Sequence, residues 1–71
     1  MSIQPEEIAK FISLNGYRTV EEIRQQFLQV DREILDMHLQ YLREKGMSKR
    51  VYYDVGDGIK RELYYVPYKT N

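Results

Sequence analysis

The spacing of hydrophobic residues changes once along this chain of 71 residues, and the change limits the folds that the chain can adopt. Up to residue 45, apolar side chains recur three and four positions apart, which predicts amphipathic helices. From Arg50 onward they alternate at every second position, around the turn-forming segment VGDG at 55–58. The sequence therefore predicts a helical half followed by a β-hairpin.

Local start and stop signals divide the helical half into three helices, expected at about 5–15, 20–28 and 32–45. Pro5 suits the first turn of a helix, and Gly16 tolerates the left-handed conformation that ends one. Thr19 and Glu22 have the spacing of a capping box, and Asp31 is the expected cap of the third helix.

Each predicted helix has one apolar face, formed by Ile8, Phe11 and Ile12, by Val20, Ile23 and Phe27, and by Leu35, Leu39 and Leu42. The hairpin is expected at about 50–66, where side chains alternate between two faces, and we expect Tyr53 and Tyr65 to face the core. The same alternation turns Tyr52 and Tyr64 outward, as a cross-strand pair. The segment Tyr17-Arg18 is long enough for a short strand that could join the hairpin as a third strand.

The predicted order is helix, short strand, helix, turn, helix and hairpin, within a single domain that spans 1–71. The second and third helices form a helix-turn-helix unit, and the hairpin that follows them is a wing. The sequence thus predicts an α+β fold of the winged helix-turn-helix type.

The segment TVEEIRQQFLQVDREILDMHLQYLREKGMSKRV resembles the helix-turn-helix core of small bacterial winged-helix regulators. In length and layout, the segment that covers roughly residues 3–66 is most similar to the FeoC-like regulators associated with ferrous-iron transport. The resemblance implies a regulator that binds DNA. Several FeoC-like proteins carry wing cysteines proposed to hold an iron–sulfur cluster, whereas the wing here reads DVGDGIK and the chain has no cysteine. We therefore expect no iron–sulfur cluster.

Composition and motifs argue against several other classes of protein. The net charge of zero disfavours coating of nucleic acid by bulk electrostatics. No nucleophile motif or phosphate-binding loop is found, and His38, the single histidine, is expected to be partly buried and hydrogen-bonded. We therefore predict a protein that is not an enzyme and holds no cofactor or metal. No apolar run is long enough for a bilayer, so we expect no membrane insertion and a cytoplasmic location.

If the chain binds duplex DNA, the third helix enters the major groove and the wing contacts phosphates. Gln40 suits an adenine edge and Met37 suits a thymine methyl group. The candidate DNA-binding residues are Arg32, Met37, Gln40, Arg43, Lys49, Arg50, Lys60 and Arg61. Basic residues on a hairpin also serve solubility and block edge pairing, so this alternative stays open.

The second hypothesis is a protein–protein interaction module built on the same fold. Three carboxylates on the outward face of the third helix would oppose DNA phosphates, although a merely solvated face would carry them too. Tyrosines are enriched where proteins meet, and a second copy of the chain is the simplest partner. The candidate protein-binding residues are Glu33, Asp36, Glu44, Tyr52, Tyr64 and Tyr68. The charges favour the interaction module, whereas the resemblance favours a DNA-binding transcriptional regulator, which is the function that we predict from the sequence, with the interaction module as the alternative.

Overall fold

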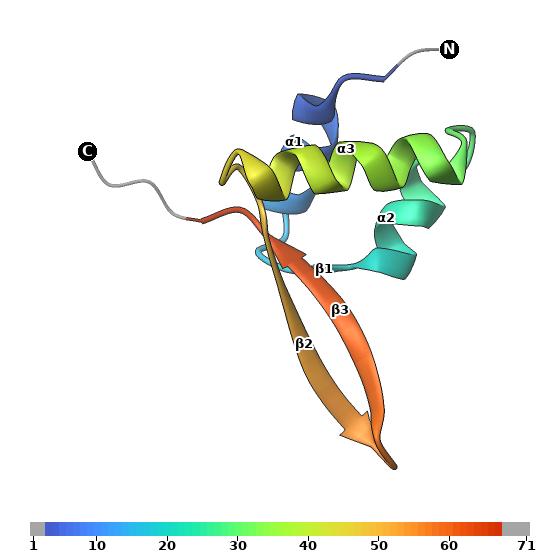
Figure 1. Cartoon of the computed structure of the whole chain (residues 1–71), viewed down its shortest axis with the longest axis vertical. Coiled ribbons are helices and arrows are strands. Elements are labelled where there is room, and N and C mark those ends of the chain that lie inside the picture. Colours follow the sequence, from blue (N-terminus) through green and yellow to red (C-terminus); the bar gives the residue numbers. More distant parts are fainter. Residues whose placement is uncertain (1–2, 68–71) are drawn as a thin grey trace.

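The computed structural model describes residues 3–67, which form three helices and a three-stranded antiparallel sheet (Figure 1). The elements are α1 (Pro5–Ser13), β1 (Arg18–Thr19), α2 (Val20–Gln26), α3 (Arg32–Glu44), β2 (Lys49–Gly56) and β3 (Ile59–Tyr65). The predicted α+β class and element order are confirmed. Each helix ends one or two residues earlier than predicted, and the short strand begins one residue later.

The predicted helix caps are confirmed. The Thr19 hydroxyl accepts a hydrogen bond from the Glu22 backbone N–H at 3.1 Å, and the Glu22 carboxylate accepts one from the Thr19 N–H at 2.9 Å. The hydrogen bond from the Thr19 backbone lowers the pKa of Glu22. At α3, the Asp31 carboxylate accepts from the Glu33 N–H at 2.9 Å. These bonds satisfy N–H groups that the helices themselves leave without partners, which fixes where α2 and α3 begin.

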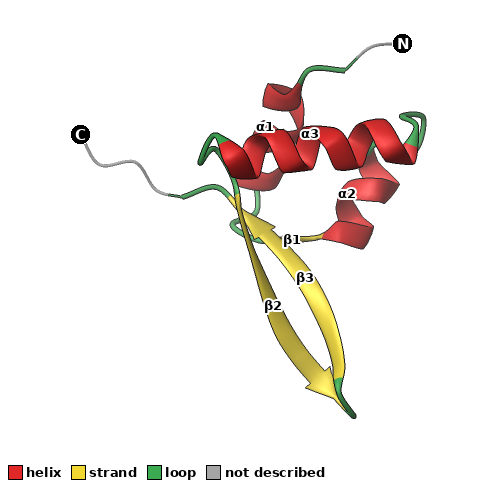
Figure 2. Cartoon of the chain, viewed as in Figure 1, coloured by secondary structure: helices red, strands yellow, loops and turns green. Residues whose placement is uncertain are grey.

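The sheet has the strand order β1-β3-β2, so β2 is an edge strand. The two residues of β1 pair with the far end of β3, where Arg18 lies opposite Tyr64. At the other end of the hairpin, Asp57 and Gly58 both have positive φ, as a two-residue type I′ turn requires. Figure 2 shows the β2–β3 hairpin projecting well beyond the helices, and every residue of β2 is exposed.

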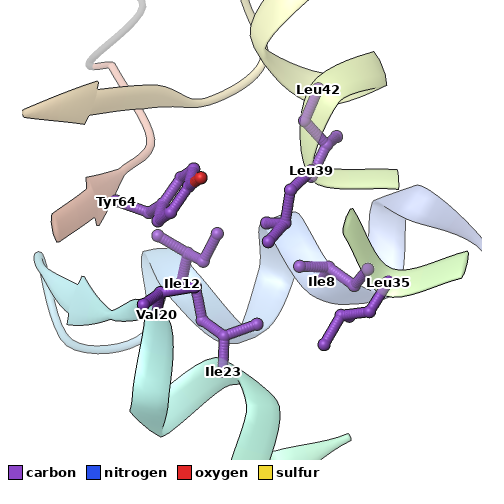
Figure 3. Packing of buried hydrophobic residues seen from close by; sticks show 8 residues of the cluster. All are labelled: Ile8, Ile12, Val20, Ile23, Leu35, Leu39, Leu42 and Tyr64. Carbon is purple, nitrogen blue, oxygen red and sulfur yellow. The ribbon is translucent and has the colours of Figure 1, made fainter. Parts of the chain in front are cut away.

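The core lies where the three helices meet the base of the hairpin (Figure 3). Its buried side chains are Ile8, Ile12, Val20, Ile23, Leu35, Leu39, Leu42 and Tyr64. The predicted leucine stripe of α3 is confirmed, while Phe11 and Phe27 pack edge-to-face at the border of the core with ring centroids 5.7 Å apart. As expected, His38 is partly buried, and its Nε2 lies 3.0 Å from the Ile3 carbonyl oxygen.

The predicted orientation of the hairpin is wrong. Tyr64 is 2% exposed and belongs to the core, whereas Tyr53 is 41% exposed and lies on the opposite face of the sheet. Tyr52 pairs with Glu62 and not with Tyr64, so the expected cross-strand pair is absent. Tyr64 and Tyr65 place one aromatic side chain on each face of β3, and a shift of one residue exchanges the two faces. The helices cover the face that carries Tyr64.

Candidate interaction surface

The outward face of α3 carries the side chains that the sequence placed there. Met37 is 67% exposed, and the other members of this face, Glu33, Asp36, Gln40 and Glu44, are exposed as well. The face points away from the leucine stripe that binds α3 to the core. It is therefore available to a partner along most of the helix.

Two further apolar residues border Met37, and the sequence interpretation missed them. Ile34 lies three residues before Met37 and Tyr41 four residues after it, so the three side chains form one stripe on the helix surface. We call Ile34, Met37 and Tyr41 the α3 stripe; each is 40–67% exposed. Their spacing was visible in the sequence. The leucine stripe already accounted for one apolar face of this helix, so a second apolar stripe was not recognised.

A hollow of about 280 Å³ lies between α2, α3 and the hairpin. Arginines from all three elements line it, namely Arg24, Arg43 and Arg50. Two carboxylates share the hollow with them: Asp36, 3.9 Å from the Arg24 guanidinium, and Glu62, 3.9 Å from that of Arg50. The hollow is therefore close to charge balance before any ligand enters.

Tyr64 connects this hollow to the core. The Arg43 guanidinium donates to the Tyr64 hydroxyl at 2.9 Å, and that hydroxyl donates to the Glu62 carboxylate at 3.2 Å. Burial raises the pKa of Tyr64, and the nearby Arg43 charge opposes this rise. The phenol thus stays protonated at neutral pH and can donate to Glu62. The interaction explains how a tyrosine hydroxyl fits at the edge of an apolar core.

Four of the eight candidate DNA-binding residues already have partners within the chain. Arg61 forms an ion pair with Glu21 at 3.6 Å, and the Gln40 side-chain amide donates to Glu44 at 3.2 Å. Arg43 and Arg50 are held in the hollow, as described above. Within residues 3–67, Arg32, Lys49 and Lys60 show no ion pair or side-chain hydrogen bond. Contacts within the chain therefore engage half of the candidate set.

Comparison of the chain with protein-family models, with curated proteins and with solved structures finds no match. In the part of the chain that the structure describes, no helix is long and apolar enough to cross a membrane. The same residues contain no group of three or more histidine, aspartate or glutamate side chains placed to hold a metal ion.

The candidate tyrosines separate in the structure. Tyr52 is exposed on the same sheet face as Tyr64, with the Arg50 guanidinium 5.2 Å from its ring centroid. Tyr64 is buried and is removed from the set of contact residues, which corrects the sequence-based assignment. Tyr68 lies outside the described residues. The opposite sheet face carries Val51, Tyr53, Leu63 and Tyr65, with Tyr17 against Tyr65 at a centroid distance of 5.4 Å.

Proposed function

We propose that this chain is a winged-helix domain that binds a protein partner through the outward face of α3. The order of elements supports the fold: α2 and α3 are joined by a short turn, and the β2–β3 hairpin follows α3 as a wing. The same layout underlies the resemblance to FeoC-like regulators. Fold alone does not define function, so the choice between partners depends on the surface of α3.

The α3 stripe is the observation that carries the proposal. Ile34, Met37 and Tyr41 expose apolar area on the helix that would read DNA, and Glu33 and Glu44 border them. Removing such area from water is favourable by about 25 cal/mol per Å² of apolar surface, before the costs of association are subtracted. The DNA backbone offers phosphates instead, at one charge per about 1.7 Å of duplex, and these repel the two carboxylates.

The same residues define the chemistry of the partner. An apolar centre with carboxylates at its border matches a surface that has an apolar patch surrounded by lysine or arginine. Because Glu33 and Glu44 are exposed, they would act mainly on the rate of encounter. Met37, at the middle of the stripe, would contribute most to the lifetime of the complex.

Photo-crosslinking from α3 tests this proposal. A photoreactive amino acid at position 37 is expected to trap one protein, while the same group at Leu14, exposed on a different element, should not trap it. With the purified partner, Glu33→Lys combined with Glu44→Lys should slow association about tenfold, an effect that salt removes. An identical crosslinking pattern from both positions, or an unchanged association rate, would reject α3 as the contact.

Duplex DNA is a second candidate partner, supported by Arg32, Lys49 and Lys60. These bases lie on α3 and the hairpin and are not engaged by carboxylates within residues 3–67. In a winged helix they would contact phosphates on either side of the recognition helix.

Titration of labelled random-sequence duplex DNA at two salt concentrations tests the second candidate. If DNA binds, Lys49→Gln with Lys60→Gln should weaken binding to every sequence and reduce the salt slope by about 2. Lys10→Gln is the control. It also removes a lysine charge, but from α1 and not from the β2–β3 hairpin that carries Lys49 and Lys60. Absence of binding at low salt would eliminate the DNA candidate, and strong binding lost in the double variant would favour it over a protein partner.

A further inference from the structure

We propose that two copies of this chain form a symmetric dimer by antiparallel pairing of their β2 strands. β2 is the long edge of the sheet, with eight residues that are all exposed, whereas the opposite edge, β1, has two residues. In Figure 1, β2 begins beside the end of α3 and then runs along one side of the hairpin, which projects beyond the helices. An edge of this length presents unpaired backbone N–H and C=O groups that can accept another strand.

Proteins usually protect such edges with charged residues, and β2 begins with Lys49 and Arg50. The charges of β2 are, however, arranged so that the strand complements itself. Antiparallel pairing around a two-fold axis normal to the sheet joins residues of the same face. One residue of the strand must therefore lie directly opposite its own counterpart, with the axis midway between them. This condition leaves few registers for the dimer.

The register centred on Tyr52 places Arg50 opposite Asp54 of the second copy, and this pair occurs twice. Moving the centre by one residue in either direction leaves Arg50 opposite Tyr52 or opposite Gly56, without an ion pair. Opposite charges that face each other across strands stabilise the pairing by about 0.2–1 kcal/mol each. Charge complementarity therefore selects the second copy as the occupant of this edge and sets its register.

The contacts that Arg50 and Asp54 make within one chain do not prevent an ion pair between them across the dimer. The Asp54 carboxylate accepts from the Gly56 N–H at 2.8 Å through one oxygen, and its second oxygen has no partner in residues 3–67. The Arg50 guanidinium lies 3.9 Å from Glu62 and carries five N–H donors in total. Each group can thus add a contact across the dimer without losing the one it has.

The dimer would also extend the apolar outer face of the sheet. In the selected register Val51 lies opposite Tyr53 of the second copy, so two mixed aliphatic–aromatic pairs join the outer faces. On the other face, Tyr52 meets its own counterpart at the axis. The edge of β2 and the α3 stripe are separate surfaces, so the dimer does not depend on the proposed protein partner and is tested without it.

Disulfide trapping tests the register directly, because the natural chain has no cysteine. Tyr52→Cys brings two thiols together at the axis, and mild oxidation should yield a covalent dimer about tenfold faster than it does for Tyr53→Cys. Tyr53 is the matched control, since it is exposed on the same strand but faces Val51 of the second copy. Equal rates for the two variants would overturn the proposed register.

A charge exchange measured by analytical ultracentrifugation tests the pairing itself. The unmodified chain should sediment as a dimer at high concentration, and Asp54→Arg should raise the dimer dissociation constant at least about tenfold, because like charges then face each other twice. Adding Arg50→Asp to this variant should restore the dimer. If Asp54→Arg does not fold by circular dichroism, Arg50→Asp alone creates equivalent repulsion. A monomer at all concentrations, or a double variant that stays monomeric, would disprove the proposal.

Discussion

Replacement of Tyr64 by alanine is expected to lower the free energy of unfolding by about 3–5 kcal/mol, the range for large aromatic side chains in a core. Replacement of Tyr53 should lower it by less than about 1 kcal/mol. Tyr64 is 2% exposed and is the sheet's contribution to the buried cluster, while Tyr53, on the same hairpin, is 41% exposed. The two variants thus remove the same atoms from opposite faces of one hairpin.

Chemical denaturation followed by circular dichroism measures this difference. A chain of 71 residues has a free energy of unfolding of about 4–11 kcal/mol, so the Tyr64→Ala variant should keep only a small part of its stability. Tyr64→Phe keeps the ring and removes only the hydroxyl between Arg43 and Glu62, with an expected loss of about 1 kcal/mol. Equal losses for the alanine variants of Tyr64 and Tyr53 would contradict the burial of Tyr64, and a larger loss for Tyr53 would mean that the opposite face of the hairpin packs against the helices.

Replacement of Leu39 by alanine should lower the free energy of unfolding by about 2–5 kcal/mol, because it opens a cavity at the centre of the core. Leu39 is 1% exposed and lies between Leu35 and Leu42 on the buried stripe of α3. The α3 helix is held to the rest of the chain by this stripe. Its loss therefore weakens the packing of α3 against α1 and against Tyr64 together (Figure 3).

Leu28→Ala is the matched control for Leu39→Ala, since it makes the same chemical change at a side chain that is 71% exposed. Its expected effect on the free energy of unfolding is within about 0.5 kcal/mol. Both variants are compared by denaturant midpoint at constant slope. A large loss for Leu28→Ala would show that this side chain is covered in solution, for example by a second molecule.

The helical half of the fold could be predicted because its signals are local. Thr19 with Glu22 and Asp31 act on backbone groups within three residues, and the leucines of α3 repeat at the period of a single helix. The Asp57-Gly58 turn is equally local, because positive φ angles at both residues define the hairpin without help from the helices. None of these features depends on how the elements pack together.

The candidate site could be predicted only in part. The exposed carboxylates of α3 were placed correctly, because their position follows from the leucine stripe on the same helix. The ion pair between Arg61 and Glu21 joins β3 to α2, and the contact of Arg43 with Tyr64 joins α3 to β3. Pairs this distant in sequence leave no local pattern, so the contacts of these two arginines within the chain could not be predicted.

The sequence by itself determined where each helix begins, which face of it is apolar and where the chain turns back as a hairpin, since short-range hydrogen bonds and periodicity decide these features. The tertiary structure alone decided which hairpin face meets the core. Tyr64 and Tyr65 are neighbours of the same type, so alternation permits either orientation. In the orientation adopted, Arg43 reaches from α3 to satisfy the buried hydroxyl of Tyr64, and a partner of this kind exists only once the helices have packed.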